Sequence, residues 1–283
     1  RRKTFLGMGV KDWILFAVCV FFAFLCIFPL WLMLSNATRT TTQIQQVGGL
    51  RALIPSRYFF SNIDALLNQG FDIWGGVVNS FVIAVSSTLL CVYFSALTAY
   101  GFVGYRFRFQ KVLFSILLAT MLIPGQLGMI GWYQLVVDLR MYDTWVPLIL
   151  PSVASATTVF FLKQYLEATY SKDLVDAARI DGSREFMTFN RIILPISAPA
   201  LATMAIFSSV YPWNNYLPPL MILNSESLYT LPLWINLLNA NTHEVNYGAL
   251  YAGLVMTVLP LLIVYLCFSK FIVGGVALGG VKE

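Results

Sequence analysis

Six long stretches of the chain contain no Asp, Glu, Lys or Arg, and this feature restricts the possible folds more than any other. A helix that crosses a hydrocarbon core of about 30 Å needs roughly 20 predominantly apolar residues, and each stretch is close to that length or longer. Only 11% of the residues are charged, against about 25% in a soluble globular domain. The composition therefore excludes an ordinary soluble enzyme, a disordered protein and a nucleic-acid binder. The stretches are residues 13–38, 73–105, 112–137, 144–162, 192–225 and 245–269.

We predict an all-α polytopic membrane protein with six transmembrane helices, in a single transmembrane domain that covers residues 1–283. The second and fifth stretches are longer than one crossing needs, so their ends belong to loops. The predicted spans are about 13–35, 73–100, 112–137, 145–162, 197–223 and 246–269.

Lys and Arg residues are unevenly divided between the loops on the two sides of these spans. Fourteen of the 18 fall on the side that holds both chain ends, and four fall on the other. Because loops rich in Lys and Arg stay in the cytoplasm, we predict that both termini are cytoplasmic and that the first span is an uncleaved anchor. The four on the opposite side are Arg39, Arg51, Arg57 and Arg140.

The sequence lacks the residues that nucleotide binding, metal binding and proton transfer would need. There is no G-x-x-x-x-G-K-[ST] phosphate loop, and the single histidine, His243, cannot form a metal site alone. We therefore expect no catalytic residue, metal or cofactor in this chain. No acidic residue, Lys or Arg lies well inside a span, which argues against a proton relay, so energy for transport would come from a partner. The four cysteines are expected to be small packing residues: Cys19, Cys26, Cys91 and Cys267.

Prolines interrupt the third and fifth stretches, and polar residues adjoin the interruptions. Irregular backbone at membrane depth is tolerated where it is buried in protein or lines a cavity. Two interpretations stay open, a translocation pathway between helices or packing kinks with locally satisfied amides. The prolines are Pro124, Pro212, Pro218 and Pro219, and the adjoining polar residues are Gln126, Asn214 and Asn215.

The loop between the fourth and fifth spans, residues 163–195, is the most highly charged segment. It is expected to form two short helices that meet at Gly182, which suits a left-handed helix end. Ser171 would cap the first helix and Ser183 the second, and Pro195 would end the second. Ala177 and Ala178 would let the first helix sit deep in a groove of another protein. From the residues alone, a solvated amphipathic loop is the favoured interpretation.

This loop resembles the cytoplasmic signature of ABC importer permeases, E-A-A-x-x-x-G-x(9)-I-x-L-P. The one departure is Asp176 where the signature has Glu, which keeps the charge and shortens the side chain by one methylene. Residues 121–126, 213–217 and 271–282 also resemble the carbohydrate branch of these permeases, most closely the shorter subunit of maltose-type importers. The signature positions are Asp176, Ala177, Ala178, Gly182, Ile192, Leu194 and Pro195.

The resemblance implies a type I ABC importer permease fold in the cytoplasmic membrane of a bacterium or archaeon. It implies a heterodimer with a second permease, two ATP-binding subunits that hold ATP and Mg²⁺, and an extracytoplasmic solute-binding protein. Asp173 would begin a coupling helix that ends at Gly182 and docks into the ATPase, so the 173–195 loop would couple hydrolysis to transport. The external loop 224–244 would contact the binding protein.

The implied function is a non-catalytic permease subunit that moves a sugar or oligosaccharide into the cytoplasm. The alternatives are an ABC permease for a non-sugar solute, such as a glycerol phosphate, and a stand-alone channel or secondary carrier. Sugars are held by stacked aromatic rings and by hydrogen-bonding amides, so residues of these types near the spans are candidate pathway residues. Aromatic residues also commonly anchor spans at the membrane interface. In the maltose case the larger partner holds most of the sugar. The candidates are Gln126, Tyr133, Trp213, Asn214, Asn215 and Tyr216, with Trp132 beside them.

Overall fold

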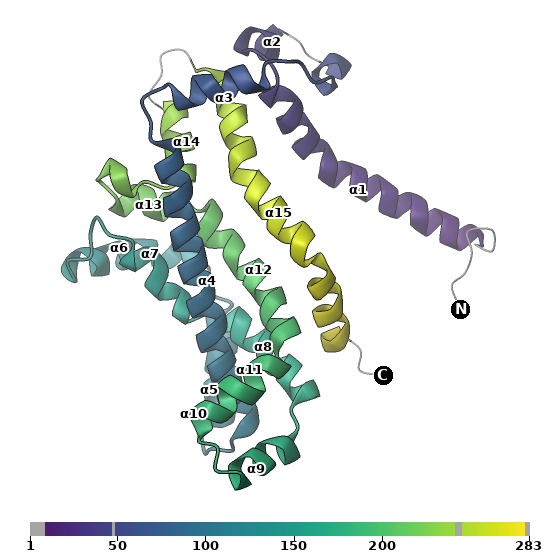
Figure 1. Cartoon of the computed structure of the whole chain (residues 1–283), viewed down its shortest axis with the longest axis vertical. Coiled ribbons are helices and arrows are strands. Elements are labelled where there is room, and N and C mark those ends of the chain that lie inside the picture. Colours follow the sequence, from purple (N-terminus) through teal and green to yellow (C-terminus); the bar gives the residue numbers. More distant parts are fainter. Residues whose placement is uncertain (1–8, 47–48, 241–244, 281–283) are drawn as a thin grey trace. The chain divides into compact units, whose positions relative to one another are not determined.

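A computed structural model describes residues 9–46, 49–240 and 245–280, and every regular element within them is helical. The helices fall into two compact units (Figure 1). Unit 1 comprises Arg1–Phe71 and Leu237–Val258, and unit 2 comprises Asp72–Asn236 and Leu259–Glu283.

Unit 1 joins one long apolar helix to a set of short helices. The long helix α1 (Val10–Ala37) has no buried side chain before its last turn. The side-chain amide of Asn62 donates hydrogen bonds of 2.8 Å to the carbonyl oxygens of Ala37 and Arg39, which ties the end of α1 to α3. Gly248 is needed at this junction because a Cβ there would lie 2.7 Å from the Arg39 carbonyl oxygen. The short helices are α2 (Thr41–Gln46), η2 (Gly49–Leu53) and α3 (Phe59–Leu67).

Unit 2 is built around the long helix α4 (Ile73–Gly104), which packs along α8 and α12 (Figure 1). Small side chains on its buried face let these neighbours approach closely; they include Ser80, Ala84, Ser95 and Ala99. The other elements of unit 2 are α5 (Gln110–Thr120), η3 (Gly125–Gly128), α6 (Met129–Asp138), α7 (Val146–Ile149), η4 (Leu150–Val153), α8 (Ala156–Thr169), α9 (Lys172–Ile180), α10 (Glu185–Thr188), the π-helix η5 (Phe189–Ile193), α11 (Leu194–Ile196), α12 (Ala198–Asn214), α13 (Leu217–Ile222) and η6 (Glu226–Leu228). Helices α14 (Leu231–Ala240) and α15 (Tyr247–Gly280) contribute to both units.

Four helical segments in the described ranges are long and apolar enough to cross a membrane, and two bent pairs raise the number to six if each pair is one span. The first pair, Gln110–Thr120 and Gly125–Asp138, bends by 90° at the predicted Pro124 break. The second pair, Glu185–Ile196 and Ala198–Asn214, bends by 81°. This second bend falls at Ser197, whereas Pro212 lies inside α12. The four segments are Val10–Ala37, Ile73–Gly104, Val146–Thr169 and Tyr247–Phe268.

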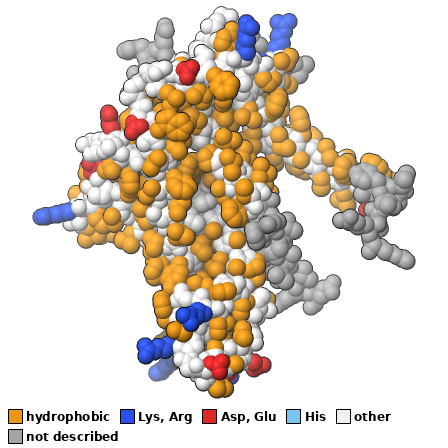
Figure 2. All heavy atoms as spheres, in the orientation of Figure 1, with side chains coloured by type: hydrophobic (Ala, Val, Ile, Leu, Met, Phe, Trp, Pro, Cys, Tyr) orange, Lys and Arg blue, Asp and Glu red, His pale blue; other side chains and the backbone are white. Residues whose placement is uncertain are grey.

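The charged side chains of unit 2 lie away from its apolar middle. Figure 2 shows hydrophobic side chains along the helices and charged side chains around the end that carries α9 and α10. At this end α8 continues through Lys163 to Thr169, so the segment expected to be loop begins as helix. Lys163 is accommodated because its ammonium lies 2.6 Å from Glu167 Oε1 and 4.5 Å from the centre of the Phe114 ring.

Candidate coupling and substrate sites

Helix α9 forms because both of its ends are capped by its own sequence. Ser171 Oγ accepts a hydrogen bond of 3.4 Å from the Leu174 amide, as predicted for the N-cap. At the other end Gly182 has φ +81°, the left-handed conformation that the sequence predicted. The amides of Gly182 and Ser183 donate to the carbonyl oxygens of Arg179 and Ala178 at 3.0 and 2.9 Å, the two bonds of a Schellman motif.

The predicted capping role of Ser183 is wrong. Helix α10 has Arg184 at its N-cap, and no side chain caps it. The Schellman motif already uses the Ser183 amide and places this residue in the turn, one position before the cap. Its Oγ lies 2.9 Å from Thr188 Oγ1, a side chain that is fully buried.

Replacing Gly182 with Val is expected to destabilise the turn between α9 and α10 by about 1–2 kcal/mol, because a β-branched residue is strained at positive φ. No atom lies within 4 Å of where a Cβ would be, so the cost comes from the backbone alone. Gly182→Asn is the matched control, since Asn adopts this conformation more readily. Limited proteolysis of the purified protein should cleave the Val variant faster, and equal cleavage of both variants would contradict the prediction.

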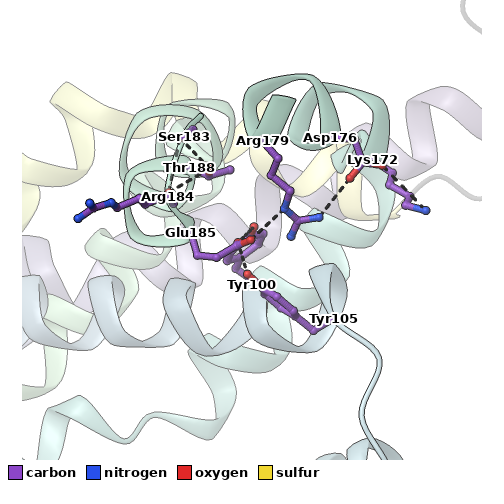
Figure 3. Close-up of polar contacts among 9 residues, drawn as sticks. All are labelled: Tyr100, Tyr105, Lys172, Asp176, Arg179, Ser183, Arg184, Glu185 and Thr188. Carbon is purple, nitrogen blue, oxygen red and sulfur yellow. Dashed lines mark hydrogen bonds and ion pairs between the residues drawn. The ribbon is translucent and has the colours of Figure 1, made fainter. Parts of the chain in front are cut away.

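Glu185 connects α9 to the rest of unit 2 (Figure 3). Its Oε1 accepts a hydrogen bond of 2.9 Å from Arg179 Nε, and Arg179 Nη1 reaches Asp176 Oδ1 at 3.1 Å. Its Oε2 accepts from the hydroxyl of Tyr105, and from that of Tyr100 at 3.4 Å. One carboxylate thus joins α9, α10 and the end of α4. We call Arg179, Glu185, Tyr100 and Tyr105 the Glu185 hub.

The protonation of the hub follows from these contacts. The Tyr105 hydroxyl and the Arg179 guanidinium hold the pKa of Glu185 below its ordinary value. The same carboxylate raises the pKa of Arg179. Both groups are therefore charged at neutral pH. The sequence places Asp176 three residues before Arg179 and four after Lys172, a spacing that favours ion pairs on one helix, and the structure contains these pairs at 3.1 and 4.0 Å. The sequence did not indicate Glu185 as their partner across the turn.

Helix α9 buries one face and exposes the other. Val175 is fully buried in a core that also contains Leu166 and Phe189. On the opposite side Ala177 is exposed, and Ile180 is 86% exposed. The helix is therefore held on the protein by Val175 and by the Glu185 hub, and it presents an apolar surface outward. Of the remaining predicted coupling residues, Asp173, Gly182 and Pro195 are exposed, and Asp176, Ala178, Ile192 and Leu194 are half-buried.

Two cavities in unit 2 adjoin α12 and the segment around η4, the first against α4 and the second against η3 and α6. One has a volume of about 400 Å³ and is lined by Ser87, Ser155, Thr158, Ser208 and Tyr211, among others. The second, of about 360 Å³, is lined by Trp132, Tyr211, Asn215 and residues around them. Leu148, Pro151 and Tyr211 line both, so the two cavities are neighbours. We call the two together the polar groove.

The structure does not gather the predicted pathway residues into one site. Asn215 lines the polar groove, but Trp213 is buried and lines a separate apolar cavity. Tyr133 packs beside Val136 in a small core. The other three line neither cavity in the groove: Gln126 and Tyr216 are exposed, and the Asn214 amide donates to the Val210 carbonyl oxygen of its own helix at 3.0 Å.

The segment expected to contact a binding protein begins at a polar clamp. The Asp143 carboxylate accepts hydrogen bonds from the amides of Asn224 and Ser225 at 2.8 and 2.9 Å, and from Ser225 Oγ at 2.5 Å. The Ser225 hydroxyl and the two amides lower the pKa of Asp143. Within the predicted loop, Asn236 and Asn239 are exposed. Residues 241–244 of that loop, which include His243, lie outside the described residues.

Comparison with known proteins gives the chain's relationships. Residues 91–276 match the model of a family described as "Binding-protein-dependent transport system inner membrane component". The chain is 33% identical over 282 residues to the arabinooligosaccharides transport system permease protein AraQ of Halalkalibacterium halodurans, which covers 100% of this chain and 99% of that protein. It is 30% identical over 282 residues to the lactose transport system permease protein LacG of Rhizobium radiobacter, over 99% of each.

A solved structure shares the fold. A chain from the crystal structure of a bacterial ABC transporter involved in the import of the acidic polysaccharide alginate superimposes with a TM-score of 0.77. The identity is 23%, and the match covers 93% of this chain and 98% of that one. The predicted all-helical architecture is confirmed for the residues that the structure describes.

Proposed function

The chain belongs to the family of binding-protein-dependent transport system inner membrane components, and on this basis we propose that it is the permease subunit of an ATP-driven importer for a neutral sugar or oligosaccharide. Its fold is that of a type I ABC permease. The observation that carries the proposal is the full-length similarity to a permease named for arabino-oligosaccharides. The permease named for lactose supports the same class of substrate.

The proposed topology has six spans, with each bent helix pair crossing once and both termini in the cytoplasm. The excess of Lys and Arg on one side supports this orientation. It places α9 and the Glu185 hub in the cytoplasm, and the Asp143 clamp outside. The clamp then fixes the start of the 224–244 loop, which would receive the solute-binding protein.

In the proposed mechanism, α9 docks through its exposed apolar face into an ATPase subunit. Closure of two ATPase subunits around ATP and Mg²⁺ would push on α9. The Glu185 hub would pass this displacement to α4, because its carboxylate binds both Arg179 on α9 and Tyr105 at the end of α4. Together with a second permease, the chain would alternate between inward-facing and outward-facing states.

The alternative substrates are less well supported. A phosphate ester or a uronate would favour Arg or Lys in the pathway, and no charged residue lines the polar groove. A stand-alone channel or carrier would have no use for an exposed coupling helix held by a network of ion pairs.

Purification of the tagged chain from its native membrane tests the proposal. We expect a second permease and an ATP-binding subunit to co-purify. In proteoliposomes, the purified complex should take up a neutral sugar only when ATP and the binding protein are both present. Sugar transport by the chain alone, without ATP, would instead support a carrier, and import of only a charged solute would show that the substrate class is wrong.

A further inference from the structure

We infer that this chain itself carries a subsite for a neutral, hydroxyl-rich ligand of the sugar class, and that the polar groove is that subsite. The inference rests on the proposed function and goes beyond it, because the maltose-type resemblance assigns most of the sugar contact to the larger partner. The two parts of the groove, of about 400 and 360 Å³, each fall in the size range of small-molecule pockets.

One end of the groove is rich in hydroxyl groups. Ser155 Oγ and Thr158 Oγ1 lie 2.8 Å apart, and Cys91 Sγ lies 3.4 Å from Thr158 Oγ1. Ser208 Oγ donates to the Met204 carbonyl oxygen at 2.7 Å, which leaves the lone pairs of the Ser208 oxygen free to accept. A set of hydroxyls that both donate and accept matches a polyol, whose groups do the same.

Thr88 Oγ1 in the apolar cavity lacks a hydrogen-bond partner among the described residues, and so does Ser87 Oγ in the polar groove. Ser87 is 2% exposed and lines the groove. Its Oγ has no hydrogen-bond partner in the part of the chain that the structure describes. A buried hydroxyl without a partner is unfavourable, and nearly all such groups in native proteins are satisfied. A ligand hydroxyl that reached this buried atom would satisfy it.

The other end of the groove combines aromatic rings with an amide. Trp132 and Tyr211 line it, and Asn215 provides a group that can both donate and accept hydrogen bonds. The aromatic rings offer flat apolar surfaces to the apolar faces of a sugar ring, and their polar tips can hydrogen-bond at its edge. Because the lining contains no charged side chain, an anionic ligand would lose its hydration without gaining a counter-charge.

The main competing occupant is a lipid chain, and the structure contains a cavity that suits one better. A space of about 280 Å³ between α4, α12 and α15 is lined mainly by aliphatic and aromatic residues such as Phe81, Val85 and Ile206. Ser209 lines that apolar cavity, whereas its neighbour Ser208 lines the polar groove. The two serines therefore form a matched pair on one helix.

The test compares Ser208→Ala and Ser87→Ala with Ser209→Ala in the complete purified transporter, reconstituted in liposomes with its binding protein. Loss of one neutral hydrogen bond corresponds to roughly a 3–10-fold change. We expect the sugar concentration for half-maximal uptake to rise by about that factor in Ser208→Ala and Ser87→Ala. We expect Ser209→Ala to match the wild type in half-saturation and in basal ATPase rate, and all three variants to keep the yield of complex.

Three outcomes overturn the subsite. The first is that Ser87→Ala and Ser208→Ala both reach half-maximal uptake at the same sugar concentration as the wild type. The second is that Ser209→Ala raises this concentration as much as the other two variants do, which would indicate a structural effect. A phospholipid that co-purifies with the wild type and is lost from Ser208→Ala would show that the groove holds lipid. If the wild-type complex takes up no sugar at all, the proposed function fails first, so the two failures are distinguishable.

Discussion

Replacing Ala177 with Arg is expected to lower ATP-coupled uptake by more than about 100-fold while the permease still inserts and assembles with its membrane partner. Ala177 is exposed on the outward face of α9, so the change costs the fold of this chain little. In a docked complex the guanidinium would be buried without a partner. Such a charge costs about 3–5 kcal/mol, which exceeds a 100-fold change in a docking equilibrium.

Uptake in proteoliposomes and co-purification of the ATPase measure this effect. Ala168→Arg is the matched control, because Ala168 is also exposed at the same end of unit 2 but lies on α8. Ala177→Ser should retain most of the uptake. Normal uptake by Ala177→Arg would show that the outward face of α9 is not the docking surface.

Replacing Glu185 with Ala is expected to lower uptake by about tenfold while ATP hydrolysis continues, because the Glu185 hub loses the group that joins α9 to α4. Hydrogen bonds to a charged group contribute about 1.5–3 kcal/mol each, and the half-exposed position reduces this through solvent screening. The ratio of sugar transported to ATP hydrolysed is the measurement. A fall in hydrolysis and uptake by the same factor would contradict a transmission role for Glu185.

Glu167→Ala is the matched control for the hub. Glu167 has a side chain that is 47% exposed, close to the 51% of Glu185, and it pairs with Lys163 in its own helix. Removing Glu167 deprives the mostly buried Lys163 side chain of its ion pair and destabilises α8, but it cuts no contact between α9 and α4. The transport ratio of Glu167→Ala should therefore equal that of the wild type.

The pH dependence of loop stability gives an independent check on the hub. Because the folded protein lowers the pKa of Glu185, its carboxylate contributes stability in full above its ordinary pKa. That contribution is lost as the pH falls through the lowered value. The difference in thermal stability between the wild type and Glu185→Ala should therefore shrink toward zero in acid. A difference that stays constant through that range would show that the charge of Glu185 is not what stabilises the loop.

The sequence predicts those parts of the coupling loop that depend on neighbouring residues. Ser171 and Gly182 cap α9 through hydrogen bonds to residues a few positions away, and Asp176 pairs with Lys172 and Arg179 over equally short separations. The contacts of Tyr105 and Tyr100 with Glu185 span 80 and 85 residues. No local pattern indicates them, because they depend on where the end of α4 lies against α10.

The side chains that line the polar groove could not be predicted from the sequence, for a different physical reason. Composition selected the aromatic and amide residues of 213–216, but the rotation of α12 about its axis decides which side chains reach the groove. Ser208, Tyr211 and Asn215 are spaced at i, i+3 and i+7 and line the polar groove. Trp213 faces the apolar cavity with Ile206 and Ser209, which have the same spacing.

Residues 208, 211 and 215 and residues 206, 209 and 213 form two separate sets of side chains on and just after α12, and this separation affects how such permeases can diverge. Side chains that line the polar groove occupy different helical positions from those that pack in the apolar cavity, so they can change independently. Point substitutions at 208, 211 and 215 could therefore alter which solute is preferred, with no insertion and no new loop. The same helix would keep its packing partners, and with them the bundle on which energy coupling depends. New specificities could then arise in small steps on an unchanged scaffold.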